Sequence, residues 1–214
     1  SFRHAFCQNP VCTPSRTSFL TGWYPHTRGH RTMYHLLHLN KDEPNVLKIL
    51  KDEGYYVWWG GKNDVIGSKN DIERSVSERF WPSDEDYERW GHKKYPGSGT
   101  FEYFWRGSPE DDSYYSFYVG KVEPDENEKD GIWFDSDCAN IYGARDLIRN
   151  HTSSDHHGRP FCIYLPLTNP HPPYAIEEPW YSLIDRNKIP ERIPTPISKD
   201  EEEWKDKPMI LKGI

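Results

Sequence analysis

The clearest chemistry in this sequence begins at Cys12, in the run C-T-P-S-R of residues 12–16. Pro14 stands where the first turn of a helix tolerates a missing N–H, so the run predicts a thiol at a helix N-terminus. Arg16 follows one turn later, and its guanidinium and the helix dipole would together favour an anion beside the sulfur. A lone cysteine is nevertheless more often a structural residue near a helix cap. The residues alone leave a nucleophile and a buried structural thiol both open.

Two further polar residues follow predicted strands. Lys62 comes just past a strand predicted at residues 55–59, and His171 comes shortly after one predicted at residues 160–167. Because sites gather at the carboxyl ends of parallel strands, these two side chains are expected to share a site. Taken singly, such a lysine is more often a surface residue, and a histidine between prolines is more often packed within its loop.

The run Y-P-H-T-R-G-H-R at residues 24–31 continues directly from the first segment. His26, His30 and Arg31 are therefore candidates for substrate contacts. Capping and internal hydrogen bonding explain the same residue types equally well, so both interpretations stay open.

The complete pattern C-x-P-S-R-x-x-x-L-T-G, from Cys12 to Gly22, resembles the signature of the formylglycine-dependent (type I) sulfatases. In that family a maturation enzyme oxidises the cysteine to formylglycine, an aldehyde whose hydrate attacks sulfur. The resemblance implies that Cys12 is the precursor of the nucleophile and, as formylglycine, a metal ligand. It also implies that Arg16 holds the formylglycine and neutralises charge around the sulfate.

Two other motifs resemble the same family. The segment from Gly54 to Lys62 is similar to its G-Y-x-T-x-x-x-G-K-x-H motif, which implies that Lys62 binds the sulfate. The usual histidine is replaced by Asp64, which would repel sulfate unless it pairs with Lys62 or a metal, or turns towards substrate hydroxyls. The apolar strand leading to His171 resembles the family's P-H-x-P segment, which implies that His171 contacts the sulfate or acts as an acid on the leaving oxygen.

The resemblance covers residues 1–64 and 137–180, and it implies a calcium ion, or another divalent cation, held by oxygen ligands. The remaining metal ligands are expected to lie outside this sequence. The resemblance thus implies that the chain is the central part of an N-terminal catalytic domain, incomplete at both ends, and it is expected to be inactive alone. The run D-H-H-G at residues 155–158 is superficially similar to a later metal-binding run of the family, but it precedes the P-H-x-P segment. A solvated turn is expected there.

Apolar patterning predicts the elements that must hold these residues. Helices are expected at residues 12–22, 43–53 and 136–150, and strands at 55–59 and 160–167, the latter buried. Residues 65–136 lack clear periodicity and are expected to form a long, family-variable excursion with short strands or turns. The order of elements predicts an α/β fold with a mixed, mostly parallel sheet flanked by helices, which the resemblance identifies as alkaline-phosphatase-like.

The amino-acid composition limits the classes of binding partner that we expect. The 214 residues include 34 acidic and 27 basic side chains, and the net charge of −7 argues against nucleic acid or an anionic membrane surface. An aromatic content of 15% argues against disorder. No apolar run is long enough to span a bilayer. The four cysteines form neither a disulfide framework nor a C-x-x-C metal pair, and the compartment stays open.

The expected function is hydrolysis of the sulfate esters of carbohydrates or aryl alcohols. The expected partners are a sulfated small molecule or glycan and the formylglycine-generating maturation enzyme. A phosphonate or phosphodiester hydrolase of the same superfamily is an alternative, and so is a non-catalytic relative that binds sulfated glycans. An unmodified thiol enzyme is a third, although no convincing Cys–His pair is visible.

Overall fold

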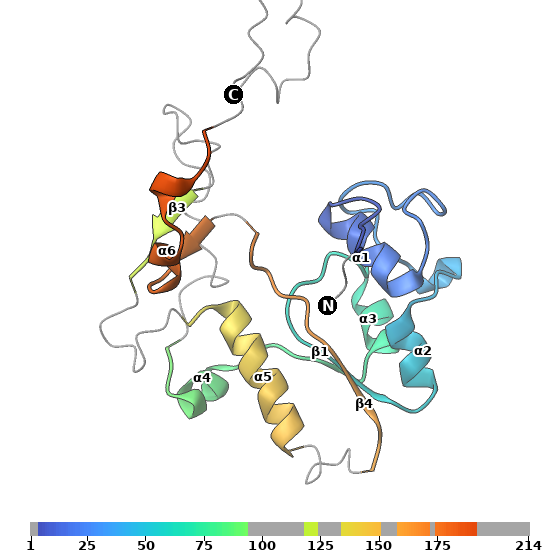
Figure 1. The fold of residues 1–214 in the computed structure, drawn as a ribbon. Coiled ribbons are helices and arrows are strands. Elements are labelled where there is room, and N and C mark those ends of the chain that lie inside the picture. Colours follow the sequence, from blue (N-terminus) through green and yellow to red (C-terminus); the bar gives the residue numbers. More distant parts are fainter. Residues whose placement is uncertain (1–3, 94–117, 124–133, 151–157, 172–173, 192–214) are drawn as a thin grey trace, which may run out of the picture. The chain divides into compact units, whose positions relative to one another are not determined.

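The computed structural model describes residues 4–93, 118–123, 134–150, 158–171 and 174–191 (Figure 1). The chain divides into two compact units, Ser1–Glu178 and Pro179–Ile214, and the first holds all the predicted site residues. The described part of the second contains helix α6 (Trp180–Leu183) and the short 3-10 helix η3 (Arg186–Lys188). In the described residues no helix has the length and apolar character needed to cross a membrane. Residues 155–157 of the predicted solvated turn lie outside the described residues.

A three-stranded parallel sheet lies at the centre of the first unit, in the order β2-β1-β4. Strand β1 (Tyr56–Trp59) pairs with β2 (Glu78–Arg79) on one edge and with β4 (Phe161–Tyr164) on the other. A separate parallel pair joins β3 (Tyr118–Lys121) to β5 (Tyr174–Ile176). These pairings confirm the predicted α/β class with a mostly parallel sheet.

Alternating side chains of β1 build a core on each face of the central sheet. Val57 and Trp59 pack with residues of α1 (Cys12–Thr21), α2 (Val46–Asp52) and α3 (Lys69–Ser75). Tyr56 and Trp58 pack instead with α5 (Ser136–Asn150). Successive residues of a strand point to opposite faces, so a four-residue apolar strand suffices to join two helical layers. Figure 1 shows α5 on one side of β1 and β4, and α1 to α3 on the other.

Helix α2 begins at Val46, three residues later than predicted from residue 43. The reason is that the Asn45 side chain caps the helix by accepting a hydrogen bond from the Lys48 amide at 2.9 Å. Glu43 lies outside the helix and is buried, where its carboxylate accepts from the His38 amide at 2.8 Å. The prediction for α1 was correct to within one residue, since Gly22 ends it in the left-handed conformation.

The segment from residue 65 onward contains more regular structure than its sequence predicted. Besides the short strand β2, it forms α3 and α4 (Asp84–Trp90), each seven residues long. Their N-caps are Ser68 and Ser83, and Ser83 forms a capping box with Asp86. Two turns of helix are too short for apolar periodicity to show, so only the serine caps could have marked them.

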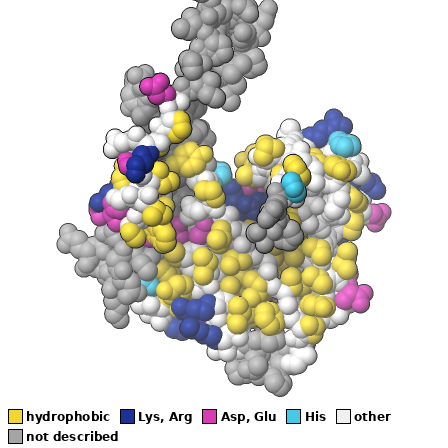
Figure 2. Space-filling model, in the orientation of Figure 1, with side chains coloured by type: hydrophobic (Ala, Val, Ile, Leu, Met, Phe, Trp, Pro, Cys, Tyr) yellow, Lys and Arg dark blue, Asp and Glu magenta, His cyan; other side chains and the backbone are white. Residues whose placement is uncertain are grey.

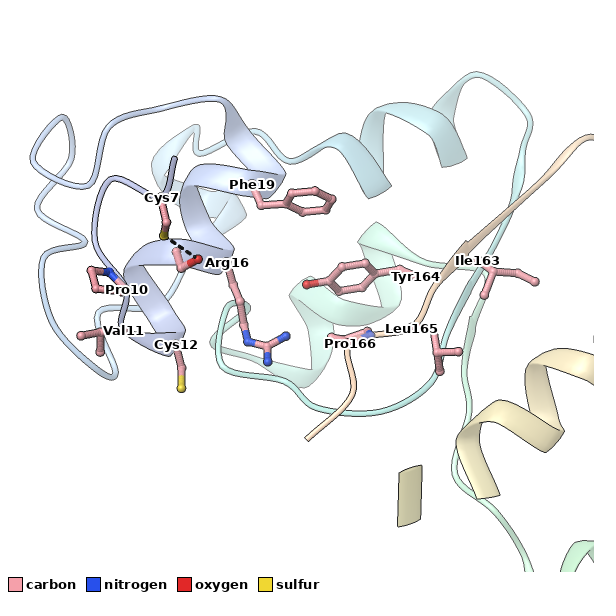
Figure 3. A pocket seen from close by; sticks show the side chains of 11 residues that line it. Cys7, Pro10, Val11, Cys12, Arg16, Phe19, Ile163, Tyr164, Leu165 and Pro166 are labelled. Carbon is pink, nitrogen blue, oxygen red and sulfur yellow. Dashed lines mark hydrogen bonds between the residues drawn. The ribbon is translucent and has the colours of Figure 1, made fainter. Parts of the chain in front are cut away.

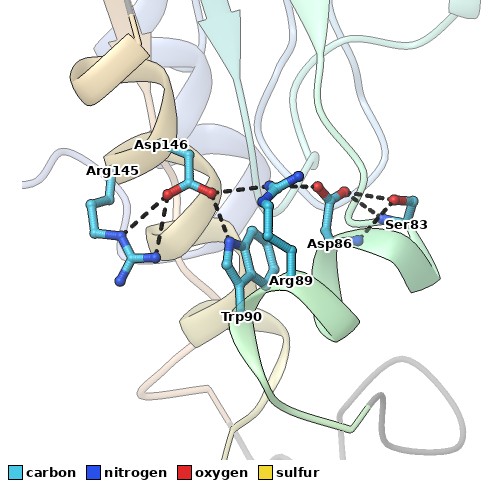
Figure 4. Close-up of polar contacts among 6 residues, drawn as sticks. All are labelled: Ser83, Asp86, Arg89, Trp90, Arg145 and Asp146. Atoms are coloured by element: carbon cyan, nitrogen blue, oxygen red, sulfur yellow. Dashed lines mark hydrogen bonds and ion pairs between the residues drawn. The ribbon is translucent and has the colours of Figure 1, made fainter.

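Helix α4 is joined to α5 by aromatic and charged contacts. Tyr87 and Trp90 of α4 pack against Phe134 and Tyr142. The Asp146 carboxylate of α5 accepts from the Trp90 indole N–H at 2.7 Å and from Arg89 at 3.0 Å (Figure 4). Asp146 therefore fastens one helix to the other, well along α5 from its N-terminus.

Strand β4 is less buried than predicted. Phe161 is 39% exposed, and the rest of the strand is half-buried. The cause is its position, because β4 pairs with β1 on one edge and no strand of the described part lies on the other. Figure 2 shows hydrophobic side chains spread over the face on which β4 lies.

Candidate active site

Cys12 is the first residue of α1, and buried neighbours hold that helix in place. Thr13 and Thr17 are almost fully buried, as is Leu20. Residues four and seven positions apart lie on one helix face, so Cys12, Arg16 and Phe19 share a neighbouring side, which lines the open pocket described below. The predicted geometry of a thiol at a helix start with an arginine one turn later is therefore present.

Lys62 reaches the same place from the end of β1. Its Nζ lies 3.9 Å from Cys12 Sγ, across fifty positions of sequence. Its backbone N–H donates to the Pro166 carbonyl at 2.8 Å, which continues the β1–β4 pairing beyond both strands. The sheet thus fixes the backbone of Lys62, and α1 fixes the position of the Cys12 sulfur.

Gly61 permits this close approach of the two chains. Its φ of +91° lies in the left-handed region, and a Cβ built on it would stand 2.3 Å from the Pro166 carbonyl oxygen. The Gly61 carbonyl accepts a hydrogen bond from Arg79, whose guanidinium also donates to the Trp59 carbonyl at 3.0 Å. Burial lowers the pKa of Arg79 to about 10. The peptide before Lys62 is therefore held from both sides.

Asp64 pairs with the lysine, one of the alternatives considered for it. Its Oδ2 lies 3.2 Å from Lys62 Nζ and 3.9 Å from Arg16 Nε. This carboxylate oxygen is buried, and it accepts no hydrogen bond from the described part of the chain. Two cations and one carboxylate leave one net positive charge beside Cys12.

An open pocket of about 800 Å³ adjoins this corner. Figure 3 shows the Arg16 guanidinium and the Tyr164 hydroxyl directed toward one another inside it. Burial raises the pKa of Tyr164, and the Arg16 charge opposes that rise. The residues that line the pocket are Cys7, Pro10, Val11, Cys12, Ser15, Arg16, Phe19, Ile163, Tyr164, Leu165 and Pro166.

Sequence reasoning did not single out Cys7, Phe19 or Tyr164 at this pocket. Phe19 stands seven positions after Cys12, so helical spacing could have placed it on the same face. Tyr164 pairs in register with Trp59, three residues before Lys62, which could have placed it near the end of the sheet. Its ring stacks against Phe19 with 6.4 Å between centroids.

His171 lies on the loop after β4 and is exposed. Its backbone N–H donates to the Thr168 carbonyl at 3.0 Å. It is not among the residues that line the pocket, although Pro166 of the same loop is. The structure therefore places the loop beside the site, and contact between the His171 side chain and a substrate stays a prediction.

The histidines of residues 24–31 differ in their surroundings. His26 is exposed and stacks on Tyr24 with 5.8 Å between ring centroids. His30 is buried, with Nδ1 against the His35 carbonyl and Nε2 at 3.1 Å from Glu43. Because both ring nitrogens already face partners within the protein, this geometry favours the hydrogen-bonding role for His30 over the predicted substrate contact.

A divalent cation was also predicted here, with Cys12 as formylglycine among its ligands. Within the described ranges no group of three His, Cys, Asp or Glu side chains could hold a metal ion. The Asp64 carboxylate, next to Lys62, already pairs with that lysine. The described residues therefore do not by themselves form a calcium site, and the predicted ion stays a prediction.

Comparison with known proteins gives one family. A family model described as Sulfatase matches residues 1–183. An ulvan-active sulfatase of Formosa agariphila is 35% identical over 85 residues, which cover 38% of this chain and 16% of that protein. A choline-sulfatase of Rhizobium meliloti is 22% identical over 199 residues, which cover 86% of this chain and 34% of that protein. The chain thus spans about a third or less of the length of these curated relatives.

Proposed function

The chain belongs to the sulfatase family, and from this premise we propose that Cys12 is the precursor of a formylglycine nucleophile in an enzyme that hydrolyses sulfate esters. The observation that carries the proposal is the corner at the start of α1. Cys12 lies there 3.9 Å from Lys62 Nζ, with Arg16 on the same helix face and an open pocket in front. A buried structural thiol would need neither cation.

Formylglycine supplies chemistry that a thiol lacks. One hydroxyl of its hydrate attacks sulfur and displaces the alcohol, and proton loss from the other expels the sulfate and restores the aldehyde. A divalent cation, when bound, would polarise a sulfate oxygen. The remaining roles belong to side chains of this chain.

Lys62 and Arg16 stabilise the negative charge that gathers around the sulfur. Fixed cations of this kind are worth a factor of about 10²–10³ in turnover each, because they need no reorganisation during the reaction. Lys62 is fixed through its backbone bond to Pro166, and Arg16 through the buried face of α1. His171, on the neighbouring loop, is the proposed acid for the leaving oxygen.

The charge of the corner suits a singly charged substrate. Without a bound metal ion, Lys62, Arg16 and Asp64 sum to one positive charge, equal and opposite to the single negative charge of a sulfate ester. A phosphate monoester carries about two at neutral pH, which is more than these three side chains neutralise. A phosphodiester carries one, so charge does not exclude the alternative substrate. The sulfatase names of both relatives favour sulfate.

The aromatic and apolar lining fits an organic group beside the sulfate. Phe19 and Tyr164 form a stacked pair next to Ile163 and Leu165, and such surfaces contact sugar or aryl rings well. The proposed substrates are therefore sulfate esters of carbohydrates or aryl alcohols. The proposed second partner is the maturation enzyme that recognises the C-x-P-x-R core.

The mass of the tryptic peptide from His4 to Arg16 tests the proposal, in protein from its native host. We expect the CH₂SH side chain of Cys12 to be replaced by an aldehyde that reacts with hydrazide. Cys7 lies in the same peptide and is exposed, so it serves as an internal control that should remain a thiol. An intact thiol at Cys12, in a host that matures other such enzymes, would refute the catalytic proposal.

Turnover by the natural protein separates the two reaction classes. We expect hydrolysis of an aryl sulfate to exceed that of a diaryl phosphate with the same leaving group, and a Cys12→Ala variant to lose both. Faster diester hydrolysis would move the assignment to a phosphodiesterase with the same nucleophile.

A further inference from the structure

The loop that carries His171 is tied to a carboxylate on another element. The backbone N–H of Thr168 donates to both oxygens of Asp137, at 2.8 and 2.9 Å. The N–H of Asn169 donates to Asp137 Oδ2 at 2.7 Å. Asp137 is 5% exposed, so these bonds are shielded from water.

Asp137 stands in the first turn of α5, where a carboxylate normally serves its own helix. Asp135 fills that role here, since its Oδ1 accepts from the Cys138 backbone N–H at 2.9 Å. Among the described residues, the hydrogen bonds that Asp137 accepts come from the loop instead. The buried Asp137 carboxylate therefore binds backbone amides that begin thirty-one positions later in the sequence. A helix-capping role does not explain this contact.

The same contacts continue to His171. The Thr168 carbonyl accepts from the His171 backbone N–H at 3.0 Å, which closes a turn from residue 168 to residue 171. The Asn169 side chain donates to Asp135 Oδ2 at 3.0 Å. Two carboxylates of the α5 N-terminus thus hold the two residues from which the turn starts.

We propose that Asp137 is a positioning residue, whose ionised carboxylate holds the Thr168 and Asn169 amides and so sets His171 for proton transfer to the leaving oxygen. This inference rests on the proposed function, in which His171 is the acid. Charged acceptors bind backbone N–H groups more strongly than neutral ones. The neutral side-chain amide of an asparagine at position 137 would therefore bind the two backbone N–H groups less strongly. An asparagine would also turn an NH₂ group toward one of the two amides.

The test uses Asp137→Asn in the natural protein that contains this chain. Asp146→Asn is the matched control, because Asp146 is on the same helix and bonds Trp90, Arg89 and Arg145 but not the loop (Figure 4). We expect kcat on a sugar sulfate, whose alcohol leaves poorly, to fall about 10- to 100-fold in Asp137→Asn, with KM within about threefold. Asp146→Asn should stay within about threefold in both constants.

Two readouts distinguish positioning from a merely structural role. The loss in Asp137→Asn should be at least about tenfold smaller on an activated aryl sulfate, which needs little help from an acid. In a double-mutant cycle, His171→Ala should remove most of the effect of Asp137→Asn, because both changes disable one group. Equal losses on both substrates, additive losses, or a His171→Ala variant as active as the parent would each overturn the inference.

Failure of the proposed function would look different. A parent enzyme that carries the aldehyde and hydrolyses aryl sulfate keeps the function whatever Asp137→Asn does. The Cys12 peptide mass, measured in every variant, removes incomplete maturation as a cause of lost activity. Activities are divided by the folded fraction from circular dichroism, and a loss that this correction abolishes also overturns the inference.

Discussion

The corner around Cys12 and the loop of His171 are built in different ways. In the corner, functional side chains contact each other directly, as Lys62 does with Cys12 and Asp64. In the loop, the predicted acid is placed through backbone bonds from a second helix, by Asp137. The corner should therefore respond to changes in its own residues, and the loop to a change at a residue that touches no substrate.

Their foundations differ as well. Lys62 follows β1, whose Val57 and Trp59 are fully buried. Because this core is close-packed, a steric change there is expected to displace the lysine directly. Asn169 and His171 are exposed, and hydrogen bonds to Asp137 and Asp135 hold the start of their turn. Steric changes should thus damage the corner, whereas loss of a single charge should be enough to misplace the loop.

Removal of the lysine charge is expected to have the largest effect. Lys62→Ala should lower kcat/KM for an aryl sulfate by about 10²–10³, since it deletes a fixed cation beside the reacting sulfur. Lys69→Ala is the control, because Lys69 is 91% exposed and pairs only weakly with Glu73 at 3.6 Å. A loss below about tenfold in Lys62→Ala, with Cys12 fully converted, would contradict the proposed role of the corner.

A methyl group at Gly61 tests the rigid base. Gly61→Ala should lower the free energy of unfolding by about 1–3 kcal/mol and reduce turnover, because the new Cβ meets the Pro166 oxygen at 2.3 Å and must displace Lys62. Gly54→Ala is the control, since Gly54 has a φ of +89° but nothing within 4 Å of its Cβ. It isolates the cost of the left-handed backbone, about 1 kcal/mol. Urea denaturation and steady-state kinetics give both quantities, and equal losses in the two variants would argue against a close-packed contact.

Much of the corner can be predicted from sequence because its signals are local. The helix that starts at Cys12 is marked by Pro14 and Gly22, and the strand before Lys62 by an apolar run closed with glycines. These features fix the elements, and parallel pairing brings their ends together. The α/β class and the helix over residues 136–150 follow in the same way from apolar patterning.

The rest of the site depends on contacts that leave no pattern. A carboxylate that bonds backbone amides thirty-one positions away, as Asp137 does, gives no spacing or composition to detect. Likewise β2 has two residues, and its neighbour α3 has seven, so neither shows a period. His30 was a candidate by residue type, and only its burial against Glu43 distinguishes a hydrogen-bonding role from a substrate contact.

The smallest expected effect concerns the charge balance of the corner. Asp64→Asn removes the carboxylate next to Lys62 and leaves two positive charges beside Cys12. Inorganic sulfate, a dianion, should then inhibit about two- to fivefold more strongly, the range for partly exposed ion pairs. Asp52→Asn is the control, because Asp52 pairs with Lys48 on the surface of α2.

The sign of this change decides what Asp64 does. If Asp64 partly neutralises the charges of Lys62 and Arg16, inhibition by sulfate becomes stronger in Asp64→Asn. KM for an aryl sulfate then falls by a similar or smaller factor. If Asp64 instead holds Lys62 in place, removal of the pair frees the lysine, and both sulfate and substrate bind more weakly. The second result would make the corner resemble the loop, because in both a carboxylate would position the functional group. The two regions would then differ only in how far that carboxylate lies from the functional group in sequence.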